Sequence, residues 1–131
     1  MKEPNWLTKQ SLLSIHSAAI ARFGGGDGIR DEGVLEAAIG RPLQLFHYEK
    51  PNLYDLAALY ASGIVTGHPF IDGNKRTGFL ALYTFLAING LRLTASEEMA
   101  AIQILALADL RLIDKELAEW ISTVCEKREQ S

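Results

Sequence analysis

The stretch HPFIDGNKRT, residues 68–77, decides how the rest of the chain is interpreted. It places an imidazole, a carboxylate, an amide, an ammonium and a guanidinium within ten residues. A proline disfavours the α region for the residue before it, so we expect a preceding helix to stop at or just before His68. The Asp-Gly-Asn turn at 72–74 is expected to supply the N-cap of a new helix that runs to Asn89. The polar cluster is therefore predicted to lie between two helices.

The start of the second helix carries the candidate chemistry. The first N–H groups of a helix have no partner within it and lie at the positive end of its dipole, which favours a phosphate. Lys75 and Arg76 add two cations there. Asp72 and Asn74 offer oxygen ligands suited to Mg²⁺ held together with a substrate phosphate. His68 is placed to take a proton from an incoming hydroxyl group.

Each of these residues also has a purely structural interpretation. A histidine before a proline is most often structural, and Arg76 could be an ordinary surface charge. Asp72 and Asn74 suit a turn and a helix cap, although Asn74 can cap with one group and bind metal with another. The joint spacing of His68, Asp72, Asn74 and Arg76 favours a functional site.

The ten residues HPFIDGNKRT resemble the signature of the Fic/Doc family, whose pattern is HPFx(D/E)GN(G/K)R. The resemblance extends from about Leu12 to about Glu119. It implies an all-α fold, a Fic/Doc-like helical bundle around a central apolar helix, with a short flap over the active site. We expect the helix from Asn74 to Asn89 at the centre, because it is apolar almost all round. It also implies ATP and Mg²⁺ as cofactors. The implied catalytic residues are His68, Asp72 and Arg76, the nucleotide-binding residues are Gly73, Asn74, Lys75 and Arg76, and the metal-binding residues are Asp72 and Asn74.

The residue after Asn74 separates two reactions within the resembled family. Most Fic proteins have glycine there and transfer AMP to a hydroxyl group, because the gap leaves room for the β-phosphate. Lys75 crowds that gap, as in the death-on-curing (Doc) toxins, which bind ATP in an inverted orientation and transfer its γ-phosphate. The resemblance therefore implies the toxin of a toxin–antitoxin pair. Such a toxin is a protein kinase acting on a hydroxyl group of a translation factor such as elongation factor Tu, which arrests translation.

Other features leave two alternatives open. Pro69 and Gly73 match the AMP-transferring pattern, and Leu80 stands where Doc proteins have a polar residue. A Fic-type AMP transferase is the first alternative, and a non-catalytic partner-binding or co-regulatory module is the second. Self-silencing Fic proteins carry the motif (S/T)xxxE(G/N), whereas here Thr94–Glu98 is followed by Met99. We therefore expect control by a separate antitoxin chain that folds on binding.

Length and composition are those of an ordinary globular protein. The 131 residues predict a single domain, 1–131, and 48% hydrophobic and 22% charged residues suit one buried core. The net charge of −3 argues against direct nucleic-acid binding. No signal pattern and no apolar run of about 20 residues occurs, so we expect no membrane partner. The single cysteine, Cys125, excludes an internal disulfide and suits the reducing cytoplasm, where we expect the protein to act.

Helical periodicity and capping residues predict the remaining elements. We expect helices over residues 9–23 with Thr8 as cap, up to Ile39 with Asp31 as cap and Gly40 as stop, over 53–67, through Ala106 with Ser96 as cap, and through Val124 with Asp114 as cap. Cys125 is expected on the apolar stripe of the last of these helices. Residues 91–93 are expected to be extended, and 127–131 to form a charged tail.

The segments before and after the helix expected at residues 31–39 are predicted as loops. The glycine-rich run 24–28 predicts a flexible loop. Arg41–Asn52 contains two prolines and lacks helical periodicity, and by the resemblance we assign it as the flap, with an ordinary surface loop as the alternative. His47 falls in that flap with no assigned role, and His16 is expected on a helix surface or at the edge of the core.

Overall fold

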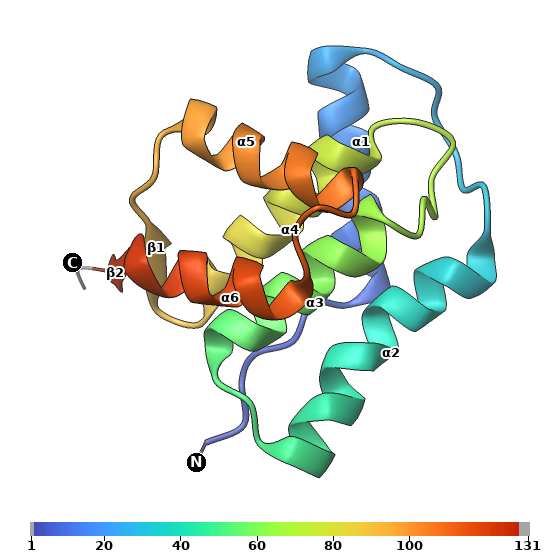
Figure 1. Ribbon diagram of the computed structural model, residues 1–131. Helices are drawn as coiled ribbons and strands as arrows, with labels where there is room; N and C mark the ends of the chain where they lie inside the picture. The colour runs from blue at the N-terminus through green and yellow to red at the C-terminus, as the bar shows by residue number, and fades with distance from the viewer. Residues whose placement is uncertain (1, 129–131) are drawn as a thin grey trace.

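The computed structural model describes residues 2–128, which form six α-helices and one two-stranded antiparallel sheet (Figure 1). The elements are α1 (Lys9–Phe23), α2 (Glu32–Glu49), α3 (Leu53–Val65), α4 (Asn74–Ile88), β1 (Leu91–Leu93), α5 (Glu97–Ala108), α6 (Asp114–Thr123) and β2 (Cys125–Lys127). The predicted all-α helical bundle is confirmed.

Polar side chains begin several helices where the sequence predicts them. The confirmed caps are Thr8, Asp31 and Ser96, each of which accepts a hydrogen bond from the backbone N–H three residues further on. The last helix differs from its prediction. Its N-cap is Ile113, and the carboxylate of Glu116 accepts from the Ile113 N–H at 3.0 Å. Asp114 is therefore the first helical residue of α6 and not its cap.

Helix α3 lies at the centre of the bundle, packed against α2, α4 and α6 (Figure 1). Eight of its 13 residues are buried. The helix predicted as central, α4, packs along one side of α3 and leaves Tyr83 and Ile88 exposed. The prediction of a central apolar helix is confirmed, and α4 shares the centre with α3, because α4 also packs against α1, α5 and β1.

Close helix contacts set where α4 begins relative to the end of α3. A Cβ atom built on Gly78 of α4 would lie 2.4 Å from Cγ2 of Val65, the last residue of α3. A Cβ atom on Gly63 would lie 3.0 Å from Cβ of Ala38 in α2. Only glycine allows these approaches, so the backbones are held at short range. The loop joining α3 to α4 is consequently anchored by packing at both of its ends.

The largest error of the sequence interpretation lies in α2. We predicted a helix that stops at Gly40 and a flap over Arg41–Asn52, whereas α2 continues to Glu49. A proline inside a helix removes one hydrogen bond and is locally unfavourable. Pro42 is nevertheless buried, on the same face of the helix as Leu35 and Ala38. Burial of that apolar face outweighs the local cost of the proline. This part of α2 runs away from the loop before α4, so it is not a flap (Figure 1).

The small sheet lies at the opposite side of the molecule from that loop (Figure 1). Leu91 pairs with Lys127 and Leu93 with Cys125 in antiparallel register, which confirms the extended segment. Cys125 belongs to this strand and not to a helix, and burial raises the pKa of its thiol. The predicted charged tail begins as part of β2, and residues 129–131 lie outside the described residues. No helix within residues 2–128 combines the length and apolarity that a membrane span needs.

Candidate active site at the start of helix α4

The chain turns sharply at His68, as predicted. The His68 N–H donates to the carbonyl of Ile64 at 3.1 Å, which closes the end of α3. His68 has a φ of 55°, in the left-handed region, where a side chain crowds its own backbone at a cost of about 1 kcal/mol. Its side chain is exposed. The turn therefore presents an imidazole to solvent directly beside the polar loop.

Arg30 holds this strained turn from a distant part of the chain. Its Nε donates to the carbonyl of His68 at 2.5 Å, and its Nη2 donates to the carbonyl of Gly67 at 2.9 Å. Carbonyl groups at a helix C-terminus carry the negative end of the dipole, so a guanidinium is favourable there. Nothing in the sequence around Arg30 indicated this role, because the contact spans 38 residues of chain.

The segment that lies beside the candidate site is the glycine-rich loop (residues 24–31), not Arg41–Asn52 (Figure 1). Ile29 forms an antiparallel bridge with Phe70, and the Ile71 N–H donates to the carbonyl of Gly28 at 3.1 Å. The flap prediction was therefore assigned to the wrong segment. The flexible-loop interpretation of 24–28 is also incomplete, because its backbone is hydrogen-bonded to the signature stretch.

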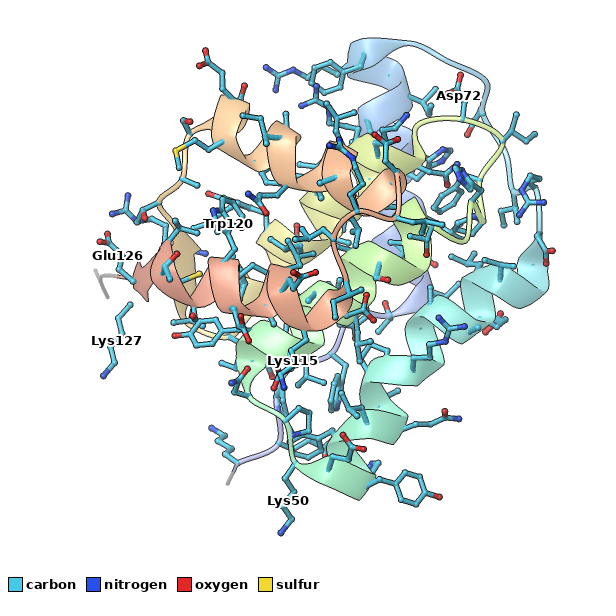
Figure 2. All side chains as sticks on the ribbon, in the orientation of Figure 1. Lys50, Asp72, Lys115, Trp120, Glu126 and Lys127 are labelled. Carbon is cyan, nitrogen blue, oxygen red and sulfur yellow. The ribbon has the colours of Figure 1, made fainter. Side chains whose placement is uncertain are left out.

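The carboxylate of Asp72 stands at the outer edge of its loop (Figure 2). Its Oδ1 accepts from the Gly73 N–H at 2.8 Å and its Oδ2 from the Gly26 N–H at 3.3 Å. A Cβ atom on Gly25 would lie 2.8 Å from Oδ2, so only glycine lets the neighbouring loop come this close. An ionised carboxylate has about four lone-pair sites, so two donors leave acceptor capacity for a cation.

Asn74 has a different role from the one predicted. It is buried; its Oδ1 accepts from the Phe70 N–H at 3.1 Å and its Nδ2 donates to the Phe70 carbonyl at 3.0 Å. The N-cap of α4 is Gly73, with a φ of 76° and no side-chain cap bond. First-turn side chains point back toward the helix N-terminus, which is why the amide reaches Phe70. The structure thus assigns Asn74 to closing the loop, in place of capping the helix.

The first turn of α4 lies beside these groups. The first hydrogen bond of the helical backbone runs from the Thr77 N–H to the Gly73 carbonyl at 2.9 Å. The N–H groups of residues 74–76 come before it, so they have no acceptor within the helix. Lys75 and Arg76 line a cavity of about 360 Å³ between α4 and α5. The cavity wall is otherwise made of Phe79, Glu97, Glu98, Ala100, Ala101, Ile104 and Leu105. Two cations from the first turn of α4 therefore border this cavity together with two carboxylates of α5, whereas His68 and Asp72 do not line it.

Comparison with known proteins decides the relationship of this chain. A sequence model of the Fic/DOC family matches residues 6–86, which include the whole candidate site up to α4. The chain belongs to the Fic/Doc family. Protein kinase doc of Escherichia phage P1 is 37% identical over 95 residues, 72% of this chain and 75% of that protein. Toxin Doc of Mycolicibacterium smegmatis (strain ATCC 700084 / mc(2)155) is 39% identical over 92 residues, 69% of this chain and 68% of that protein.

The Fic/Doc signature is bordered by α1 through two contacts that the sequence did not indicate. The guanidinium of Arg76 lies over the ring of Phe23, 4.0 Å from its centroid, a cation–π contact. His16, predicted at a surface or core edge, is buried with only 2% of it exposed, and its ring stacks on Phe70 of the signature. Its position on the same helical face as Leu12 and Ala19 could have predicted burial, but not the partner it meets. Helix α1 therefore forms one wall of the Fic/Doc site.

Among the described residues, no three His, Cys, Asp or Glu side chains gather to hold a metal on their own. A single exposed carboxylate matches the way Mg²⁺ binds with substrate phosphates, since this ion keeps most of its ligands from water and phosphate. His47 is exposed in the last turn of α2, in the part of that helix that runs away from the signature (Figure 1).

Proposed function

We propose that this protein is a Doc-type toxin that transfers the γ-phosphate of ATP to a hydroxyl group of a target protein. The observation that carries the proposal is the junction of α3 and α4, where an exposed histidine, a carboxylate and a free helix start are joined in residues 68–77. The similarity to Protein kinase doc supports phosphoryl transfer over AMP transfer, and the similarity to Toxin Doc supports the role as a toxin.

In this proposal the chain binds the phosphates and moves one proton. The leading N–H groups of α4 bind phosphate oxygens, and Lys75 and Arg76 offset the charge that develops on the transferred group. His68 accepts the proton of the attacking hydroxyl group, a role that contributes about 10²–10⁴-fold in rate. The hydroxyl oxygen then forms the new bond to the γ-phosphorus, and ADP leaves.

Asp72 is the residue proposed to hold Mg²⁺. Its carboxylate is exposed, and two backbone N–H groups fix its direction. When bound, Mg²⁺ neutralises negative charge on the ATP phosphates. Asn74 supports this site indirectly, because its amide holds Phe70 and so shapes the loop that carries Asp72.

Lys75 is proposed to select which phosphate reaches His68. Its side chain borders the cavity between α4 and α5, where a glycine would leave more open space. An ammonium group there competes with deep binding of the triphosphate tail. We therefore expect Lys75→Gly to lower γ-phosphate transfer, and any label arriving from the α-phosphate in this variant would support the selecting role.

Labelled ATP tests the proposal directly. The purified protein is incubated with Mg²⁺, a bacterial extract and either γ-labelled or α-labelled ATP, with His68→Gln as the inactive control. We expect protein labelling from the γ position only. Labelling from the α position would establish the AMP transferase alternative, and labelling from neither would favour the non-catalytic binding module.

The proposal extends to a translation factor such as elongation factor Tu as the target and to an antitoxin as the partner. Helix α5 exposes the apolar side chains of Met99, Ile102 and Leu105. Such a surface favours binding of another protein chain over it. We expect overproduction of the protein alone to arrest translation in bacteria, and the His68→Gln variant not to. Unimpaired growth with the intact protein would contradict the toxin assignment.

A further inference from the structure

We infer that His16 is a positioning residue for phosphoryl transfer, which holds the backbone of Asp72 and thereby aims its carboxylate. The inference rests on the proposed function, because it concerns the residue proposed to hold Mg²⁺. His16 lies on α1 and is separated from Asp72 by 56 residues of chain. Its role can therefore be read only from the folded structure.

One imidazole contacts the signature loop in two ways. The Nε2 atom of His16 lies 2.9 Å from the carbonyl oxygen of Asp72. A carbonyl oxygen can only accept, so Nε2 carries the hydrogen in this bond. The same ring stacks on Phe70, with centroids 3.8 Å apart and an interplanar angle of 5°. His16 thus holds the loop both by a directional bond and by a flat apolar contact.

The loop crosses α1 at short range beside this bond. Gly73 has a φ of 76°, and a Cβ atom built there would lie 3.8 Å from Nε2 of His16 and 3.1 Å from Cδ1 of Ile20. The peptide between Asp72 and Gly73 therefore lies directly against α1. That peptide also carries the N–H that donates to Oδ1 of Asp72.

Asp72 is consequently held at three points by three separate donors. His16 donates to its carbonyl, Gly73 to its Oδ1 and Gly26 to its Oδ2. The carbonyl bond fixes the peptide plane, and that plane carries the donor for Oδ1. Loss of the His16 donor frees the peptide to rotate, which releases the carboxylate at the point where α4 begins.

Two substitutions separate the two contacts. His16→Phe keeps a ring to stack on Phe70 and removes the donor. His16→Gln keeps an amide donor close to the Nε2 position and removes the ring. If His16 serves only the packing of α1, the phenylalanine variant should behave like the wild type and the glutamine variant should be the impaired one.

The first measurement is backbone amide exchange of residues 70–76 in the protein without ATP or metal. We expect faster exchange in His16→Phe than in the wild type and His16→Gln, with unchanged exchange in α3. The second is γ-phosphate transfer as a function of Mg²⁺ concentration. We expect the Mg²⁺ concentration for half-maximal activity to rise about tenfold in His16→Phe, and to stay within about threefold of wild type in His16→Gln.

Unchanged exchange at residues 70–76, or an unchanged Mg²⁺ requirement in a folded His16→Phe protein, would overturn the inference. An impaired His16→Gln beside a normal His16→Phe would overturn it as well. Failure of the proposed function would give a different result, because the wild-type protein itself would then transfer no label from γ-labelled ATP. The exchange measurement on the metal-free protein still decides in that case whether His16 holds Asp72.

Discussion

Helix α3 and the loop that follows it are adjacent in the chain but are held in different ways. Most of α3 is buried among α2, α4 and α6, and glycines allow its neighbours to come close. The loop at residues 68–73 exposes its histidine and its carboxylate, and directional hydrogen bonds from α1, from Arg30 and from Asn74 hold it in place.

The difference separates stability from function. Many weak apolar contacts position α3, so a change there is expected to lower the free energy of unfolding of the whole domain. A few bonds position the loop, and the exposed ones, such as those from Arg30, are replaceable by water at small cost in stability. Changes around the loop are therefore expected to lower activity while the fold persists.

Substitution of His68 is expected to have the largest effect on activity. Loss of the general base in His68→Ala should lower γ-phosphate transfer by about 10²–10⁴-fold. Because the side chain is exposed, the melting temperature should stay close to that of the wild type. His47→Ala, at an exposed histidine on α2, is the matched control and should keep full activity. More than a tenth of wild-type activity in His68→Ala would rule out the assigned role.

Substitution of Gly78 tests the packed region. The new methyl group of Gly78→Ala would meet Cγ2 of Val65 at 2.4 Å, so we expect a loss of about 2 kcal/mol in the free energy of unfolding. Gly40→Ala is the control, since a Cβ atom there has no neighbour within 4 Å and alanine should stabilise α2 by about 0.5–1 kcal/mol. Urea denaturation measures both, and shifts of the same sign would contradict the packing argument.

Substitution of Arg30 tests how the loop is held. Arg30→Ala removes the donors to the carbonyls of Gly67 and His68, which support the strained turn. We expect the rate of γ-phosphate transfer at saturating ATP to fall about tenfold, equivalent to about 1.4 kcal/mol, with little change in melting temperature. Arg41→Ala, at an exposed arginine of α2, should leave the rate unchanged. Equal rates for the two variants would show that the turn does not need Arg30.

Substitution of Tyr60 probes the core through pH. The phenol accepts a hydrogen bond from the Leu7 N–H at 3.2 Å, and burial raises the pKa of Tyr60 to about 12. Tyr60→Phe should cost about 1 kcal/mol at neutral pH. Above pH 10 the unfolded tyrosine ionises first, so the wild type should lose stability between pH 10 and about 12.

The phenylalanine variant lacks this ionisation, so its stability deficit relative to the wild type should shrink and then reverse across the same pH window. All other side chains are the same in the two proteins, so their contributions to the pH dependence cancel in the difference. Denaturation curves at pH 8, 10 and 11 measure it. A constant stability difference between the two proteins would contradict the role of burial at Tyr60.

The amino-acid sequence by itself determined the elements whose causes are local. The cap at Thr8, the stop before Pro69 and the periodicity of α4 each depend on residues within a few positions, so they were predicted correctly. The signature stretch likewise indicated the Fic/Doc family, because its ten residues carry their chemistry in fixed spacing.

Only the tertiary structure decided the rest. Helix α2 passes through Gly40 and Pro42 because its buried face packs on α3, which no local propensity could show. His16 and Arg30 reach the loop from 56 and 38 residues away. Such contacts exist only once the bundle has packed, since burial and shape, not neighbouring residues, bring these side chains together.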